Sequence, residues 1–424
     1  MRAVLAILVV CLIGKDLAFV PFPQIVRGCA QGLCLIVGIF AVLPALSGNL
    51  LRRYWPMLVY LLVLLLAVPF TEFPGFVTMQ IGSLMSAIVF AIGYFENRSE
   101  PPDQKLKWLM FWIVLVYAIV SALCLILIKI DPTQAYESMF IGDIAGIELR
   151  FRGLFSKSAQ MAAAGGILLG LAMIRVKSIP LKLSLIVLGL TCLTLPQCRS
   201  FWVAALIAGG ATIWLYFRHL RKWIIVSCGA LAVLTLSLLA FNVSVDTTGL
   251  AAFARVNTIS TLTGRTSLWQ SAFDGWSQKP LLGYGFTLGG AGLNFGEPLS
   301  PNANPTEISR RTLHNGYVQS LLDSGLVGLL FYVTTILIAI SRICRYDRAR
   351  QFPEVLYVLL FLSISNGGES VIYSGSVFQS LCFWIFATFA MSLKRGPLSA
   401  PSSTVQPITN KGRGVISRFP NLMH

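Results

Sequence analysis

Long apolar runs separated by short polar connections make up most of this chain of 424 residues. Within each run the apolar residues are continuous, and the runs approach the roughly 20 residues that a helix needs to cross a bilayer. Strands of a membrane barrel would instead show about ten residues of alternating polarity. The pattern therefore predicts an all-α polytopic membrane protein of about twelve transmembrane helices, at residues 3–20, 28–46, 55–70, 76–94, 108–130, 158–175, 182–196, 200–217, 223–243, 322–341, 354–368 and 376–393.

Composition agrees with a chain that is dissolved largely in lipid. Hydrophobic residues make up 56% of the sequence and charged residues 12%, whereas a soluble domain carries about 25% charged residues. The net charge of +16 could indicate a nucleic-acid partner. However, the cations recur in short clusters between apolar runs, as they do in membrane proteins, so we expect no nucleic acid.

The side on which the cations cluster predicts the orientation in the membrane. Most of the 33 Lys and Arg residues fall in connections on one side, which by the positive-inside rule is the cytoplasm. Both termini are then cytoplasmic. We expect residues 1–393 to form a single transmembrane domain and residues 394–424, which are rich in Pro, Ser and Gly, to form a disordered basic cytoplasmic tail.

The remaining cations gather mainly in two outer connections. One is residues 131–157, and the other is residues 244–321, a large periplasmic loop between spans nine and ten. A connection as long as the second is usually functional. Its segment 263–279 has helical apolar spacing, which predicts an amphipathic helix at the membrane surface. Outer cations of these two loops and of the hairpin between spans seven and eight are Arg150, Arg152, Lys157, Arg199, Arg255, Arg265, Lys279, Arg310 and Arg311.

The outer face offers arginines and one histidine as its chemistry. Among the three histidines only His314 faces outward, and no Asp-x-Asp or Asp-x-Glu pair occurs, so neither a zinc site nor a clustered-carboxylate metal site is expected. The planar fork of arginine binds phosphate and stays charged. Arginines near the lipid surface therefore indicate a lipid phosphate or diphosphate, with His314 as a general base or an orienting group. If a metal were needed after all, Glu307 and Glu369 would be the first candidate ligands.

Simpler interpretations of the same residues exist. An outer arginine is often only an interfacial anchor, and a lone loop histidine is often structural. Gly325 and Gly328 could be small residues at a helix contact. The aromatic residues of 276–286 could form an interfacial belt.

Two adjacent stretches resemble the O-antigen ligase and polysaccharide polymerase family. "HNGYVQSLLDSGLVG" is similar to its outer-loop signature, and "TGRTSLWQSAFDGWSQKPLLGYGF" to its upstream segment. "FRGLFSKSAQMA" is similar to its Arg-Gly-x-Phe segment and "LPQCRSFWVAAL" to its Ser-Arg-Ser helix start, reduced here to Arg199-Ser200. The residues that carry the likeness are Arg152, Gly153, Arg199, Ser200, Gly264, Arg265, Trp269, Pro280, Gly283, Gly285, His314, Asn315, Gly325 and Gly328.

This resemblance implies an enzyme of the bacterial inner membrane with a fold like that of the C-type glycosyltransferases. Such enzymes move glycan from undecaprenyl diphosphate to an acceptor hydroxyl at the periplasmic face, with inversion and without metal or cofactor. The acceptor is another glycan or the lipid A core, and other polysaccharide assembly proteins are further candidate partners. Transferred to this chain, the likeness gives catalytic roles to His314 and Arg265, and substrate-binding roles to Arg152, Arg199, Arg311, Asn315 and Trp269.

Other functions remain as alternatives. A flippase or transporter of lipid-linked oligosaccharides also has about twelve spans, but such folds usually show two similar halves and polar residues within spans. Here the longest loop is placed asymmetrically, and no internal repeat is found. A purely structural protein would leave the arginine–histidine grouping unexplained. Ligase and polymerase stay open, with the 260–330 region favouring a surface or exopolysaccharide polymerase.

Overall fold

The residues that the structure describes form a helical bundle and a small β-hairpin. The computed structural model describes residues 24–45, 48–97, 99–140, 147–222, 265–289, 313–345, 352–373 and 378–393, with Arg2, Val4 and Ala6. Its main helices are α2 (Gln24–Val42), α3 (Gly48–Ala67), α4 (Pro74–Glu96), α5 (Pro102–Ile130), α6 (Pro132–Ala135), α7 (Ser158–Arg175), α8 (Ile179–Thr194), α9 (Arg199–Tyr216), α12 (Arg265–Gln278), α15 (Gly316–Arg345), α16 (Pro353–Ser365) and α17 (Phe378–Ser392). Short 3₁₀ turns lie at Leu43–Ala45, Val68–Phe70 and Arg218–Leu220.

Most of the predicted spans coincide with helices of the described residues. Five helices there are long and apolar enough to cross a membrane, namely Asn49–Phe70, Pro74–Glu96, Pro102–Ile130, Ser158–Arg175 and Gly316–Arg345. Shorter apolar helices occupy Gly28–Val42, Ile179–Thr194, Pro353–Ser365 and Phe378–Ser392. The predicted spans 3–20 and 223–243 and the predicted tail lie outside the described residues, apart from the three isolated positions near the N-terminus. The number twelve therefore stays a prediction.

The first large outer connection is not a plain loop, and the all-α prediction is wrong in this detail. Strands β1 (Tyr136–Phe140) and β2 (Ile147–Phe151) pair antiparallel there, with Tyr136 opposite Phe151. Their rings meet edge to face at 5.6 Å between centroids. Aromatic and β-branched residues are enriched in paired strands because they pack well across the sheet. In such a short segment this preference escapes a search for long apolar runs.

Helices differ in how far the rest of the protein buries them. A helix at the centre of the bundle is buried on all sides, whereas a helix at the outside is buried on one side only. Every residue of α17 is buried, which suits a sequence that is apolar all round. It packs against α4, α15 and α16. By contrast, α5 leaves large apolar side chains such as Phe111, Trp112 and Ile119 exposed. These outward apolar residues are what a lipid-facing surface requires.

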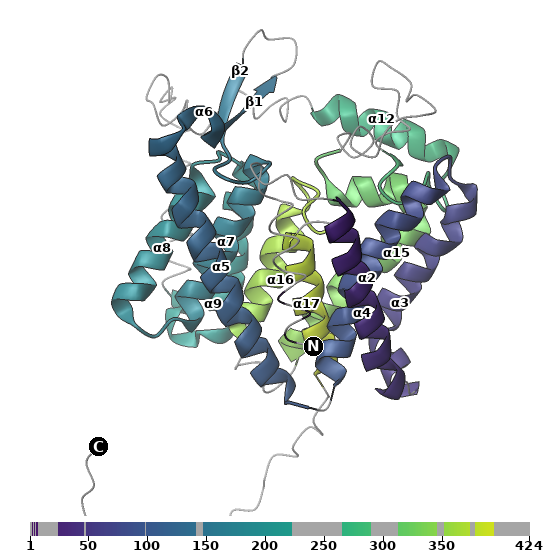
Figure 1. The fold of residues 1–424 in the computed structure, drawn as a ribbon, viewed down its shortest axis with the longest axis horizontal. Coiled ribbons are helices and arrows are strands. Elements are labelled where there is room, and N and C mark those ends of the chain that lie inside the picture. The colour runs from purple at the N-terminus through teal and green to yellow at the C-terminus, as the bar shows by residue number, and fades with distance from the viewer. Residues whose placement is uncertain are drawn as a thin grey trace, which may run out of the picture. The chain divides into compact units, whose positions relative to one another are not determined.

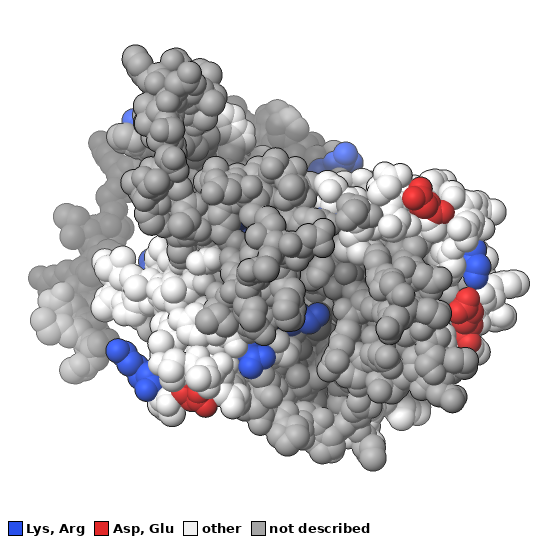
Figure 2. Space-filling view, turned by 90° about the horizontal axis from the view of Figure 1, so that it is seen from above, with Lys and Arg blue, Asp and Glu red and all other residues white. Residues whose placement is uncertain are grey.

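The β-hairpin and α12 lie at the same end of the helices (Figure 1). Figure 2 looks onto this end, where described Lys and Arg side chains stand apart with Asp and Glu among them. The described residues thus form no single basic patch on this face. Both segments belong to connections that the cation pattern assigns to the outer side, so one end of the bundle carries the candidate chemistry.

Candidate active site

A break in helix α15 shapes the site. Gly325 interrupts the helix with φ 65° and ψ −171°, a conformation open to glycine but strained for other residues. A Cβ at this position would collide with the carbonyl oxygen of Leu281. The freed N–H of Leu326 donates to the carbonyl of Pro280 at 2.8 Å. The Pro-Leu segment of one motif therefore lies in the helix break made by the other.

The next residues of the first motif wrap around the same turn of α15. The N–H of Tyr284 donates to the carbonyl of Leu322 at 3.1 Å, and that of Gly285 to the carbonyl of Asp323 at 2.8 Å. The Asp323 carboxylate accepts the N–H of Thr287 at 2.8 Å. Segments 280–289 and 313–328, which the sequence presents as two motifs, are thus one packed unit.

Helix α12 adds the third part of this unit. It packs on α15, and its buried Ala272 joins Leu313 and Leu322 in a small apolar cluster. The indole N–H of Trp269 donates to the carbonyl of Leu313 at 3.0 Å. Trp269, which the sequence suggested as a substrate contact, here holds the main chain just before His314.

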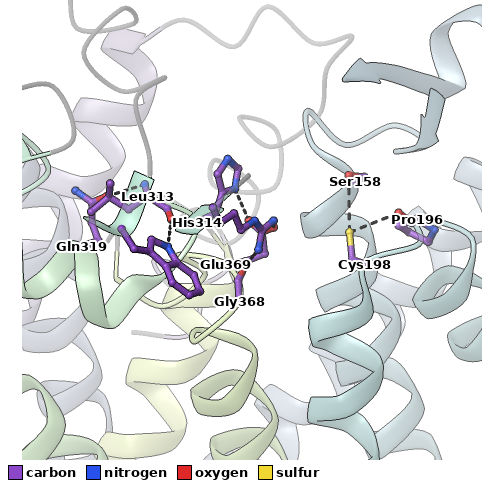
Figure 3. Close-up of polar contacts among 10 residues, drawn as sticks. Ser158, Pro196, Cys198, Leu313, His314, Gln319, Gly368 and Glu369 are labelled. Atoms are coloured by element: carbon purple, nitrogen blue, oxygen red, sulfur yellow. Dashed lines mark hydrogen bonds and ion pairs between the residues drawn. The ribbon is translucent and has the colours of Figure 1, made fainter. Parts of the chain in front are cut away.

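Glu369 joins the two predicted catalytic residues. Its Oε1 accepts from the Arg265 guanidinium Nη2 at 2.6 Å, and its Oε2 lies 2.9 Å from Nδ1 of His314. Arg265 also donates through Nη1 to the carbonyl of Gly368. Figure 3 shows this group, with His314 above Glu369 and Gly368. The side chains of Arg265, His314 and Glu369 are 21%, 34% and 13% exposed.

The charges of this group fix the protonation of the carboxyl. Burial alone would raise the pKa of Glu369, but His314 and Arg265, by charge and by hydrogen bonds, lower that pKa to about 2. Glu369 is therefore an anion that only accepts hydrogen bonds. His314 Nδ1 must then carry the donated proton. In the neutral imidazole the other nitrogen, Nε2, keeps its lone pair and can act as a base.

The backbone at His314 is held in an unusual conformation. Its φ is 50°, in the left-handed region, and such non-glycine residues cost roughly 1–3 kcal/mol and cluster at functional sites. Next to it, the side-chain oxygen of Asn315 accepts the N–H groups of Tyr317 and Val318 at 3.0 and 3.2 Å. Asn315, a predicted substrate contact, thus caps the start of α15.

Two further predicted arginines have different positions. Arg199 is the first residue of α9, and its neighbour Ser200 lies directly against Gly368. The backbone of Arg199 therefore lies beside the loop that carries Glu369. Arg152 follows the hairpin and donates through Nε to the carbonyl of Gln134 at 3.2 Å. Within the described ranges, no hydrogen bond or ion pair joins Arg152 to Arg265, Glu369 or His314. Arg311 lies outside the described residues.

Glu369 has a different role here from the one the sequence suggested. It had stood only as a possible metal ligand, together with Glu307, which lies outside the described residues. In the structure both of its oxygens face cationic or hydrogen-donating partners, and a metal ion would have to displace them. Among the described residues no group of three or more His, Cys, Asp or Glu could hold a metal. The one sequence signal was an acidic residue directly after a predicted span.

A helical membrane protein with an ion-paired arginine–glutamate–histidine site is the class that fold and site define. Residues 183–333 match the model of a protein family described as O-antigen ligase. This match confirms the resemblance to the O-antigen ligase and polymerase family over residues 183–333. At this coarse level the family implies transfer of a lipid-linked glycan to an acceptor. A search of curated proteins found no match.

Proposed function

We propose that this protein transfers glycan from undecaprenyl diphosphate to an acceptor hydroxyl at the periplasmic face of the inner membrane. The observation that carries the proposal is the pairing of Glu369 with both Arg265 and His314. A carboxylate that fixes the tautomer of a histidine leaves Nε2 free as a general base, as in other base-orienting pairs. An arginine at the same carboxylate supplies the fork that a diphosphate needs.

The reaction follows as a single displacement. The acceptor hydroxyl oxygen attacks the anomeric carbon of the donor sugar while His314 Nε2 takes the hydroxyl proton. The bond between this carbon and the diphosphate oxygen breaks, and undecaprenyl diphosphate leaves with the electron pair. Arg265 donates to that oxygen through the N–H groups that have no partner among the described residues, and so stabilises the developing charge. Attack from the opposite face inverts the anomeric centre.

The acceptor distinguishes the two members of this class. A second lipid-linked repeat unit as acceptor makes the protein a surface or exopolysaccharide polymerase, and the lipid A core makes it an O-antigen ligase. Both reactions use the same donor and the same three residues. Reconstituted protein offered each acceptor in turn separates them by the product formed, a longer lipid-linked chain or a glycosylated lipid A core.

His314→Ala in proteoliposomes tests the proposal. The variant should insert and fold, because a partly exposed residue contributes little packing, while glycan transfer falls by about 10²–10⁴. The matched control is His219→Ala in the turn Arg218–Leu220, which should transfer at the wild-type rate. Transfer should also survive EDTA. Movement of the lipid-linked glycan across the bilayer with no new glycosidic bond would instead indicate the flippase alternative.

A further inference from the structure

The residue before His314 is held through both of its backbone polar groups, the N–H and the carbonyl. Leu313 is fully buried. Its carbonyl accepts the indole N–H of Trp269 at 3.0 Å, and its N–H donates to Oε1 of Gln319 at 3.1 Å. Figure 3 shows both contacts beside the His314–Glu369 pair. The main chain that leads into His314 therefore depends on the side chain of Gln319, one turn into α15.

Asp323 sets which way the Gln319 amide points. The Nε2 of Gln319 lies 2.9 Å from both carboxylate oxygens of Asp323. The N–H of Leu313 can only donate, so the amide must turn its oxygen to Leu313 and its NH₂ group to Asp323. A reversed amide would place NH₂ against the N–H of Leu313 and leave buried donors unpaired, which is unfavourable.

Asp323 is itself fixed by the glycine-rich segment. Its carboxylate accepts the backbone N–H of Thr287 at 2.8 Å and that of Gly289. Asp323 is 0% exposed and Gln319 4% exposed, so water does not compete for these bonds. An unbroken series of hydrogen bonds thus runs from segment 287–289 through Asp323 and Gln319 to Leu313.

We propose that Asp323 and Gln319 are positioning residues that hold His314 in its left-handed conformation, within reach of Glu369. They act through the Leu313 peptide and touch no substrate. The consequence for catalysis rests on the proposed function, in which His314 Nε2 is the base. Loss of the series should lower kcat and leave the KM for the lipid-linked donor nearly unchanged, because substrate contacts are kept and only the base is misplaced.

Three variants test the series in reconstituted protein. Gln319→Met keeps the volume and removes both bonds, so kcat should fall about tenfold or more. Gln319→Glu places two carboxylates face to face, and its kcat should fall by a similar factor. Asp323→Asn leaves a single acceptor oxygen for the N–H groups of Thr287 and Gly289, so its kcat should fall by a similar factor. The control is Gln379→Met at another buried glutamine, in α17, which should keep the wild-type kcat.

A readout independent of glycan transfer separates this proposal from the proposed function. In protein with His219 and His424 replaced, His314 is the only histidine that diethyl pyrocarbonate can modify, and its N-carbethoxylation is followed by its absorbance. Gln319→Met should raise the modification rate at least about threefold, because an imidazole that leaves Glu369 exposes both nitrogens. An unchanged modification rate in Gln319→Met would overturn the series. If Gln319→Met is modified faster but the wild-type protein transfers no glycan, the series is upheld and the proposed function is rejected.

Discussion

Gly368 packs directly against Ser200, so that a Cβ at position 368 would collide with the Cβ and Oγ of that serine. Ser200 is the second residue of α9, and Gly368 accepts a hydrogen bond from Arg265 and precedes Glu369. The start of α9 and the loop that carries the site carboxylate are therefore in van der Waals contact. This contact places the first turn of α9 beside the loop that precedes Glu369.

Gly368→Ala should displace the loop and misplace Glu369. Since the clash is with a Cβ on a helix and not with a flexible side-chain end, the loop must move, and we expect glycan transfer to fall about tenfold or more. The measurement is the initial rate of transfer in proteoliposomes at saturating donor.

A second substitution at the same contact should restore the activity of Gly368→Ala. Ser200→Gly removes the colliding atoms, at a cost of about 0.5–1 kcal/mol for glycine in a helix, so Gly368→Ala with Ser200→Gly should regain most of the lost activity. Gly209→Ala in the same helix is the control, because nothing lies within 4 Å of the added methyl group. An active Gly368→Ala single variant would mean that the loop position is not critical.

The low pKa of Glu369 predicts how stability depends on pH. Its folded-state pKa of about 2 lies below the ordinary value of 4.5. The ion pairs therefore contribute their full stability above about pH 4.5 and lose it as the pH falls toward 2. Glu369→Gln should remove this part of the acid destabilisation. Thermal unfolding of both proteins in detergent between pH 2 and 6 measures it.

The same substitution should also impair the reaction at neutral pH. An amide at position 369 no longer fixes the proton on His314 Nδ1, so transfer should fall by about 10²–10⁴. Glu72→Gln, at an exposed carboxyl between α3 and α4, is the matched control. In the unfolding experiment, equal loss of stability in acid for wild type and Glu369→Gln would show that the carboxylate is not held as an ion pair.

Most of the membrane helices could be predicted from the sequence, because a continuous apolar run is a local signal. The predicted span 158–175 coincides with α7. The predicted span 322–341 began too late, since α15 starts at Gly316 with the polar residues that cap and line the site. The hairpin of β1 and β2 was missed because two strands of five residues leave too little periodicity to distinguish them from a loop.

The site could be predicted only in part, because its geometry depends on contacts distant in sequence. Arg265 and His314 stood out as the arginine and histidine of recognisable motifs, and the structure brings them to one carboxylate. That carboxylate, Glu369, is 55 residues from His314, and its role as their link could not be read from local pattern. Asn315 and Trp269 are motif residues that make hydrogen bonds to the main chain of the protein itself.

The membrane orientation remains a prediction with a direct test. In a cysteine-free background, Ser300→Cys should react with a membrane-impermeant maleimide in intact spheroplasts, because segment 244–321 is predicted to be periplasmic. Ser178→Cys, at the exposed start of α8, should react only after permeabilisation. The reverse pattern would place the Arg265–Glu369–His314 group on the cytoplasmic side and remove the basis for a periplasmic reaction.

Arg265→Lys tests whether the fork of the guanidinium matters or only its charge. Arg265 donates to Glu369 and to the carbonyl of Gly368 from different nitrogens. A lysine keeps one charge but cannot hold both acceptors and still present a planar pair of donors to a diphosphate. We expect transfer to fall by about 10²–10³, the usual effect of losing one preorganised donor to developing charge. Arg52→Lys, at an exposed position of α3, should be neutral. A wild-type rate for Arg265→Lys would mean that charge alone suffices, and that the diphosphate is bound by other cations.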